Sequence, residues 1–210
     1  TDTFAASLQW LPQRIQNWLQ ILSLRIQIGR YRDYGLPEPN FLPTQAHPTV
    51  NSEILDKIRH GKIHPRSGIE SIAGHRVYFT DGTSSEYDVI IAATGYTINF
   101  PFFDRNFIDW GEAKHIPLYL RVFHPEHSSL FFVGLIQPQG CIWTLTEAQS
   151  YLIAQYLIGK AQLPSNWREQ AAREGEYWAN QFITRPRHSL EVHYYPYLKK
   201  LQQMSAGKSA

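Results

Sequence analysis

A glycine follows an apolar run in the segment Asp88-Val-Ile-Ile-Ala-Ala-Thr-Gly-Tyr96, and this order of residues suits the binding of a flat or anionic group. An apolar run without alternation is typical of a strand covered on both faces, and open α/β folds bind ligands at the carboxyl edge of such strands. Because glycine has no Cβ, a ligand could reach the main chain at Gly95. Taken alone, these residues favour the simpler alternative, a core strand that closes on a glycine turn.

A second segment, Leu130-Phe-Phe-Val-Gly-Leu-Ile-Gln-Pro-Gln-Gly140, has the order of a strand, a loop bounded by glycines and the approach to a helix. Thr144 and Glu147 follow at the spacing of a capping box, which predicts that the helix starts there. Free backbone amides and the positive end of the helix dipole would favour a developing negative charge by about 0.3–1 kcal/mol. Many α/β proteins share this arrangement, so the segment alone does not identify a ligand.

Both segments occur with other motifs in the order and spacing of bacterial flavin-containing monooxygenases, and the chain resembles this family over nearly its whole length. The matching motifs are residues 35–39, 47–50, 88–96 with 100–102, 130–140 with Glu147, and 187–188. The resemblance implies the cofactors FAD and NADP(H), a small-molecule substrate and O2. It also implies oxygenation of a soft nitrogen or sulfur nucleophile, or of a ketone.

The resemblance further implies cofactor contacts, although it does not show which atom each residue touches. In the first segment these residues are Ala93, Thr94, Gly95 and Tyr96. In the second segment they are Gly134, Leu135 and Gln137, beside the isoalloxazine ring. We therefore expect Gly95 and Gly134 to face one shared ring system. No side chain stands out as an acid, base or nucleophile, so no catalytic residue is assigned.

The sequence departs from the family in its phosphate-binding motifs. Family members carry two Gly-x-Gly-x-x-Gly fingerprints and a hydroxylase-type signature, and this sequence contains none of them. Glycine turns at helix N-termini supply much of the binding of a pyrophosphate. We therefore expect a C-terminal fragment of an FAD- and NADPH-dependent monooxygenase that is not competent alone. The alternative is a truncated α/β module that binds or assembles without redox activity.

The fold class implied by the resemblance is α/β, as an incomplete flavoprotein with two dinucleotide-binding (Rossmann-like) domains. Residues 1–92 would be the C-terminal part of the NAD(P)H-binding domain with a helical insertion. Residues 93–210 would be the C-terminal part of the FAD-binding domain with a helical tail.

The apolar pattern predicts the elements that would position these segments. Apolar residues three, four or seven apart predict a helix over residues 4–28, interrupted near Pro12. Asn51 or Ser52 should cap a short helix that ends at Gly61. An Asp-Gly pair at 81–82 predicts a tight reversal between strands at 76–80 and 87–93.

Two helices are predicted in the second half of the chain. The first starts at the capping box and stops at Gly159, and the second is capped by Ser165 and runs through Phe182. The basic run Arg185-Pro-Arg-His188 is predicted to anchor the C-terminal segment by salt bridges. The last dozen residues are polar and are expected to fray.

Composition excludes several classes of function. Twenty basic and eighteen acidic side chains give a net charge of +2, without a basic run suited to nucleic acid. The single cysteine, Cys141, excludes a disulfide within the chain and favours a reducing, cytoplasmic location. The helix over 4–28 is basic and contains tryptophan, but a core-facing role is favoured over contact with a membrane surface. A homo-oligomer stays open.

Histidine spacing gives the only suggestion of a metal site. His60 and His64 are four residues apart, and His124 and His127 are three apart, as metal ligands on a helix can be. The first pair straddles a predicted helix end, and the second lies in a predicted loop. We therefore expect surface histidines and no metal.

Overall fold

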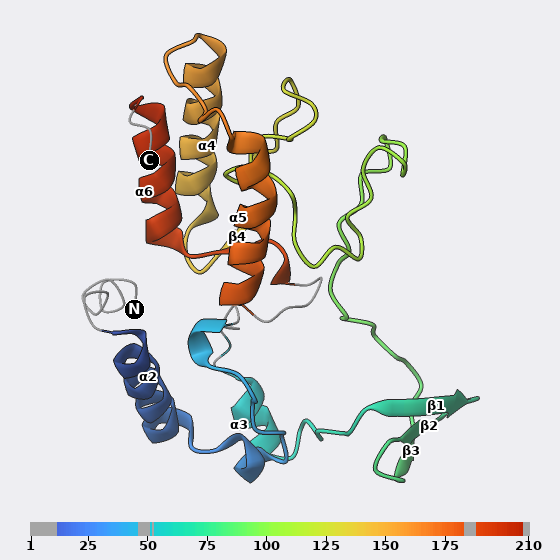
Figure 1. Cartoon of the computed structure of the whole chain (residues 1–210). Helices are drawn as coiled ribbons and strands as arrows, with labels where there is room; N and C mark the ends of the chain where they lie inside the picture. The colour runs from blue at the N-terminus through green and yellow to red at the C-terminus, as the bar shows by residue number, and fades with distance from the viewer. Residues whose placement is uncertain (1–11, 46–50, 52, 183–187, 208–210) are drawn as a thin grey trace. The chain divides into compact units, whose positions relative to one another are not determined.

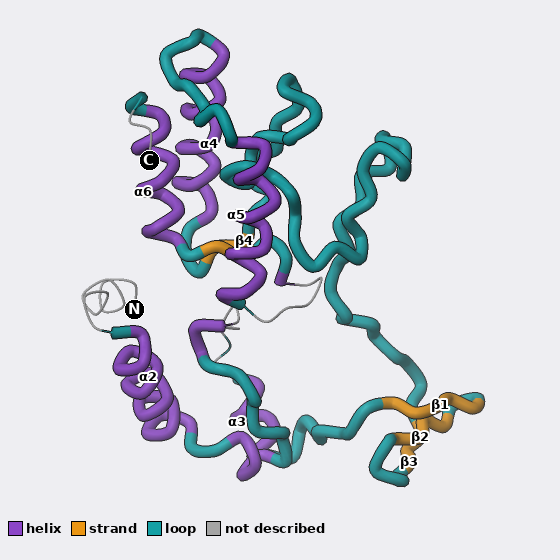
Figure 2. The backbone as a smooth tube through the Cα atoms, in the orientation of Figure 1, coloured by secondary structure: helices purple, strands orange, loops and turns teal. Residues whose placement is uncertain are grey.

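The computed structural model describes residues 12–45, 51, 53–182 and 188–207 of the chain. Helices and strands are mixed along the chain (Figures 1 and 2). The helices are α2 (Gln13–Ile28), α3 (Ile54–Arg59), α4 (Ile142–Leu157), α5 (Trp167–Gln181) and α6 (Tyr194–Ser205), with 3-10 turns η1 (Tyr31–Tyr34) and η2 (Pro43–Gln45). The strands are β1 (Ile69–Ala73), β2 (Arg76–Phe79), β3 (Ser84–Glu86), β4 (Gln137–Pro138) and β5 (Glu191–Val192).

The described residues fall into two compact units. The first unit holds the described residues of 18–40 and 49–95, and the second holds those of 1–17, 41–48 and 96–210. Helix α2 confirms the predicted helix from Gln13 onward, directly after Pro12, and residues 4–11 lie outside the described part. The N-cap residue of α3 is Glu53, and the predicted capping role of Asn51 is met from two residues before it, because Oδ1 of Asn51 accepts hydrogen bonds from the N–H groups of Glu53 and Ile54. Ser52 lies outside the described residues.

The first unit contains a three-stranded antiparallel sheet in the order β1-β2-β3. The predicted Asp-Gly reversal is confirmed between β2 and β3. Gly82 has φ +80°, and the side chain of Asp81 accepts hydrogen bonds from the backbone and hydroxyl of Thr83. These hydrogen bonds lower the pKa of Asp81. Strand β1, which pairs with β2 through a second turn, was not predicted.

The predicted buried strand at 87–93 is wrong. The third strand ends at Glu86, and residues 89–95 have no strand pairing in the described part of the chain. Val89 and Ile91 are 74% and 85% exposed. A strand of this composition needs hydrogen-bonded neighbours and two covering layers, and neither is provided for it among the described residues.

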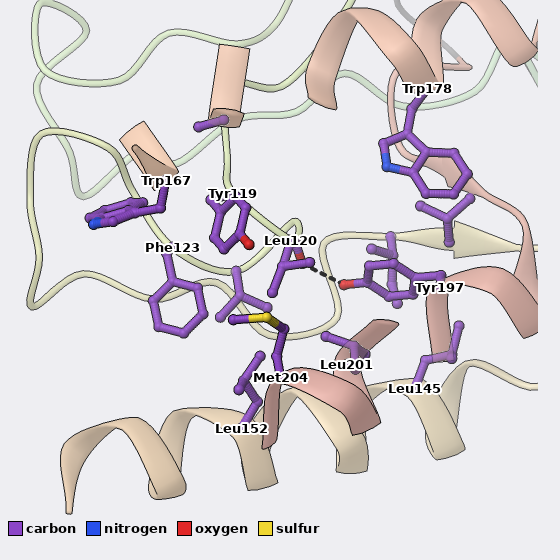
Figure 3. Close-up of a cluster of buried hydrophobic side chains, with 14 of the residues drawn as sticks. Tyr119, Leu120, Phe123, Leu145, Leu152, Trp167, Trp178, Tyr197, Leu201 and Met204 are labelled. Carbon is purple, nitrogen blue, oxygen red and sulfur yellow. Dashed lines mark hydrogen bonds between the residues drawn. The ribbon is translucent and has the colours of Figure 1, made fainter. Parts of the chain in front are cut away.

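The core of the second unit lies between three helices and a buried turn at residues 119–123 (Figure 3). Its fully buried side chains come from α4, α5, α6 and the turn, and include Leu145, Leu152, Ala171, Tyr197, Leu201 and Leu120. Burying one such leucine stabilises the fold by roughly 1.5–3 kcal/mol. A second cluster, with Ile116, Leu118 and Phe132 at its centre, packs aromatic rings around Phe100 and Trp110.

Three predictions for the helices of this unit need correction. Helix α4 starts at Ile142, so Thr144 lies in its first turn and the capping box does not form at its start. Helix α5 begins after Asn166 rather than at a cap on Ser165. The terminal segment does not fray before Ser205, because α6 directs Leu201 and Met204 into the core. The predicted stop of α4 near Gly159 is confirmed.

One histidine is not on the surface as expected. His124 is buried and stacks on Phe107 and Trp110, and burial lowers its pKa. No group of three or more His, Cys, Asp or Glu suited to a metal ion occurs among the described residues. Within the same residues, no helix is long and apolar enough to cross a membrane.

Candidate cofactor site

Residues 134–138 form a loop that is held on two sides within the second unit. On one side β4 pairs in parallel with β5, and the N–H of Gln137 donates to the carbonyl oxygen of Leu190 at 2.7 Å. On the other side the N–H of Gly134 donates to Oε1 of Gln149 on α4, at 2.8 Å. The backbone amides of Gly134 and Gln137 are therefore used inside the protein and are not free to bind a cofactor.

The reason for glycine at position 134 is its packing against α4. Gly134 has φ +78°, and a Cβ placed there would lie 3.3 Å from Cγ2 of Thr146. This contact is tighter than normal van der Waals contact, and L-residues rarely adopt such a φ. A cofactor is therefore not needed to explain the glycine. Leu135 is half-buried against the second core cluster, whereas the side chain of Gln137 is exposed.

The N-terminus of α4 follows this loop directly. Its N-cap residue, Cys141, is exposed and makes no side-chain capping hydrogen bond. The partial positive charge of the helix end is therefore not offset by a side chain at the N-cap. The end of α4 can stabilise negative charge on a group that approaches it.

The other predicted segment lies at the end of the first unit. Ala93, Thr94 and Gly95 are exposed and lie outside any helix or strand, and Tyr96, also exposed, begins the part of the chain assigned to the second unit. Gly95 has φ +93°, and a Cβ built on it would have no heavy atom within 4 Å. The backbone at Gly95 is thus uncovered, and its contact with a cofactor stays a prediction. That it shares one ring system with Gly134 stays a prediction.

The strand beside this loop carries a buried acid. Glu191 of β5 is 2% exposed, and its Oε1 contacts Nδ1 of His188, an ion pair when the imidazole is protonated. This contact confirms the predicted anchoring for His188, while Arg185 and Arg187 lie outside the described residues.

Sequence reasoning missed a buried polar network behind the loop. The network contains Gln149 of α4, Glu174 of α5 and Tyr197 of α6, each of which is at most 7% exposed. A signal for Gln149 exists in the sequence, since it lies on the apolar stripe of α4 with Leu145 and Leu152. Polar residues on such stripes are usually hydrogen-bonded inside the protein.

This region also contains buried charged side chains. Arg121 is 1% exposed, and burial lowers its pKa to about 10, a shift opposed by the charge of Glu174. Lys200 donates to Glu174 at 3.1 Å. Burial raises the pKa of Tyr119 to about 12 and raises that of Tyr197 further. Both tyrosines therefore stay protonated across the physiological range.

The sequence profile described as flavin-binding monooxygenase-like matches residues 3–210, which is almost the entire chain. The chain belongs to this family. Enzymes of the flavin-containing monooxygenase family use FAD and NADPH.

Individual relatives agree with the family assignment. The chain is 30% identical to N-oxide-forming dimethylaniline monooxygenase 2 of Rattus norvegicus over 91% of its own length and 36% of that protein. It is 34% identical to a decarboxylating 4-hydroxybenzoate brominase of Marinomonas mediterranea over 74% of its own length and 30% of that protein. The human flavin-containing monooxygenase 2 is 29% identical over 91% of the chain. The chain thus spans about a third of the length of these relatives.

The two predicted segments fit a flavin to different degrees. The open backbone at Gly95 fits the close approach of a flat ring, and the uncapped end of α4 fits a ring that acquires negative charge. The Gly134 and Gln137 amides do not fit as hydrogen-bond donors to the cofactor, since both are already bonded. Any contact from this loop must therefore use other groups, such as the exposed side chain of Gln137.

Proposed function

We propose that this chain is the C-terminal part of an FAD- and NADPH-dependent monooxygenase that oxygenates soft nitrogen or sulfur nucleophiles or ketones. The observation that carries the proposal is the match to the family profile over residues 3–210. Tertiary amines are the first substrates to consider, because a relative matched over 91% of the chain is named for N-oxide formation. Residues 1–92 and 93–210 would belong to the NAD(P)H-binding and FAD-binding domains.

Two segments would hold the flavin in this proposal. Ala93, Thr94, Gly95 and Tyr96 would contact it through exposed backbone and side chains. Gln137 would contact it through its exposed amide side chain, with Gly134 and Leu135 shaping the loop behind. The two Gly-x-Gly-x-x-Gly fingerprints would be supplied by sequence upstream of Thr1.

The bound flavin would supply the redox chemistry, with NADPH as reductant and O2 as the source of oxygen. The residues of this chain would bind and orient the flavin and screen it from water. The end of α4 favours negative charge nearby by about 0.3–1 kcal/mol. The buried aromatic cluster around Phe100, Trp110 and Phe132 would keep water from the adjacent loop.

Isotope incorporation tests the proposal. The protein encoded by the reading frame extended upstream of Thr1 would be incubated with NADPH, 18O2 and a tertiary amine, a thioether or a ketone in turn. We expect one labelled oxygen in the product of at least one reaction and none when NADPH is omitted. Without NADPH oxidation or labelled product for any of the three classes, the enzyme assignment fails, and the alternative of a module without redox activity is favoured.

A further inference from the structure

A continuous relay of hydrogen bonds joins the Gly134 loop to the buried turn at residues 119–123. The N–H of Gly134 donates to Oε1 of Gln149 at 2.8 Å, and Nε2 of Gln149 donates to the hydroxyl of Tyr197 at 2.7 Å. The hydroxyl of Tyr197 then donates to the carbonyl oxygen of Leu120 at 2.6 Å (Figure 3). Gln149, Tyr197 and Leu120 are each 0% exposed, so the two links between them are buried from water, whereas the link at Gly134 is part-buried.

The relay has a single direction. A flipped amide at Gln149 would place its NH2 group against the N–H of Gly134, and two donors would face each other. With the observed orientation, the hydroxyl of Tyr197 accepts from Gln149 and so must direct its own proton to Leu120. Each group in the relay thus fixes the next, and removal of one leaves a buried donor or acceptor without its partner.

The far end of the relay is held in an unusual backbone conformation. Leu120 and Arg121 both have positive φ angles, +53° and +55°, which are uncommon for residues with a side chain. The N–H of Leu120 donates to Oε2 of Glu174 at 2.8 Å, so both peptide groups of Leu120 are held by helices. Such conformations persist only where the surrounding structure over-determines them. The Leu120 end of the relay is therefore held in a fixed position.

We propose that Gln149, Tyr197 and Glu174 are positioning residues that set the place of the Gly134 loop against the flavin. This inference rests on the proposed function. None of the three would touch the cofactor, because all are buried inside the second unit. They act through the peptide of Gly134, whose amide is committed to Gln149 and whose position follows from the fixed turn at Leu120.

Amide hydrogen exchange of the 210-residue chain tests the relay without a cofactor. In Gln149→Leu the N–H of Gly134 loses its acceptor, and we expect its exchange to accelerate by about 5- to 100-fold. Tyr197→Phe breaks the next link and should accelerate the same amide by a smaller factor. Gln155→Leu on α4 and Tyr195→Phe on α6 are matched controls that should leave Gly134 unchanged.

The amides of α5 separate positioning from general stability. If Gly134 and the α5 amides accelerate by equal factors, the residues act only on global stability and the inference is overturned. Selective acceleration at Gly134 supports the relay.

The flavin is tested in the upstream-extended protein. There, Gln149→Leu should shift the visible flavin band or slow its reduction by NADPH, and Gln155→Leu should not. An unchanged spectrum and rate in Gln149→Leu would overturn the positioning role. If the extended protein with its native residues binds no flavin, the proposed function fails and the positioning role falls with it, whatever exchange shows at Gly134.

Discussion

The carboxylate of Glu174 accepts a hydrogen bond of 2.8 Å from the N–H of Leu120, which lies 54 residues earlier in the chain. This contact joins α5 to a turn whose backbone is left-handed at two successive residues. Lys200 from α6 donates to the other oxygen of the same carboxylate. One acidic side chain thus connects α5, α6 and this turn.

Replacing this carboxylate should destabilise the protein. In Glu174→Ala the buried N–H of Leu120 loses its acceptor, and we expect the free energy of unfolding to fall by about 1–3 kcal/mol. Glu174→Gln keeps an acceptor, so its free energy of unfolding should fall less. Urea unfolding followed by circular dichroism measures both. Glu176→Ala, at an exposed position of the same helix, is the control. A loss as large for Glu176→Ala would contradict the role given to Glu174.

Gly134→Ala should be destabilising for two separable reasons. The left-handed backbone costs about 1–2 kcal/mol for a residue with a Cβ, and the new methyl group would crowd Cγ2 of Thr146. Thr146→Ser removes that methyl while keeping the hydroxyl that donates to Trp143. In a double-mutant cycle of thermal unfolding, the serine should recover part of the loss. Strict additivity would show that the crowding is absent.

Stability should depend on pH through His193. Burial lowers the pKa of His193 below its ordinary 6.5, and Glu191 opposes the shift. The unfolded chain therefore binds the proton first as the pH falls. The resulting stability is fully present above pH 6.5 and decreases as the pH falls from there through the lower folded pKa. The unfolding free energy of His193→Gln should change less across this range. An identical pH profile for the native chain and the variant would refute the assignment.

The exposed apolar run at residues 89–91 should promote self-association of the isolated chain. Ile91 is 85% exposed, and burying an isoleucine contributes roughly 1.5–3 kcal/mol. Ile91→Lys should therefore weaken association by about tenfold or more, as measured by sedimentation velocity. Thr97→Lys adds the same charge at an exposed polar position and should have little effect. Equal effects of the two lysines would point to charge repulsion instead.

Local signals in the sequence predicted the parts of the fold that local chemistry decides. Asp81-Gly82 forms its hairpin, Asn51 caps α3, and α4 stops near Gly159, because each depends on residues a few positions apart. The strand expected at 87–93 failed, since a strand depends on neighbours that its own sequence does not specify. The expected fraying failed for a similar reason, because Leu201 and Met204 find a core formed by distant helices.

The candidate site itself stays a prediction, but the structure explains some of the residues that indicated it. The sequence drew attention to Gly134, but the reason for the glycine is the packing of Thr146, and its amide is bonded to Gln149. Residues such as Gln149 and Glu174 could not be assigned their partners from sequence, because these partners lie 15 and 54 residues away. At Gly95 the backbone is uncovered, and cofactor binding there stays a prediction.

The most direct measurement is the visible absorbance of the purified protein extended upstream of Thr1, recorded before and after anaerobic addition of NADPH. We expect flavin bands that bleach with NADPH and return on admission of air. The 210-residue chain alone should retain little or no flavin. A colourless extended protein that leaves NADPH unconsumed would contradict the proposed flavin-dependent function.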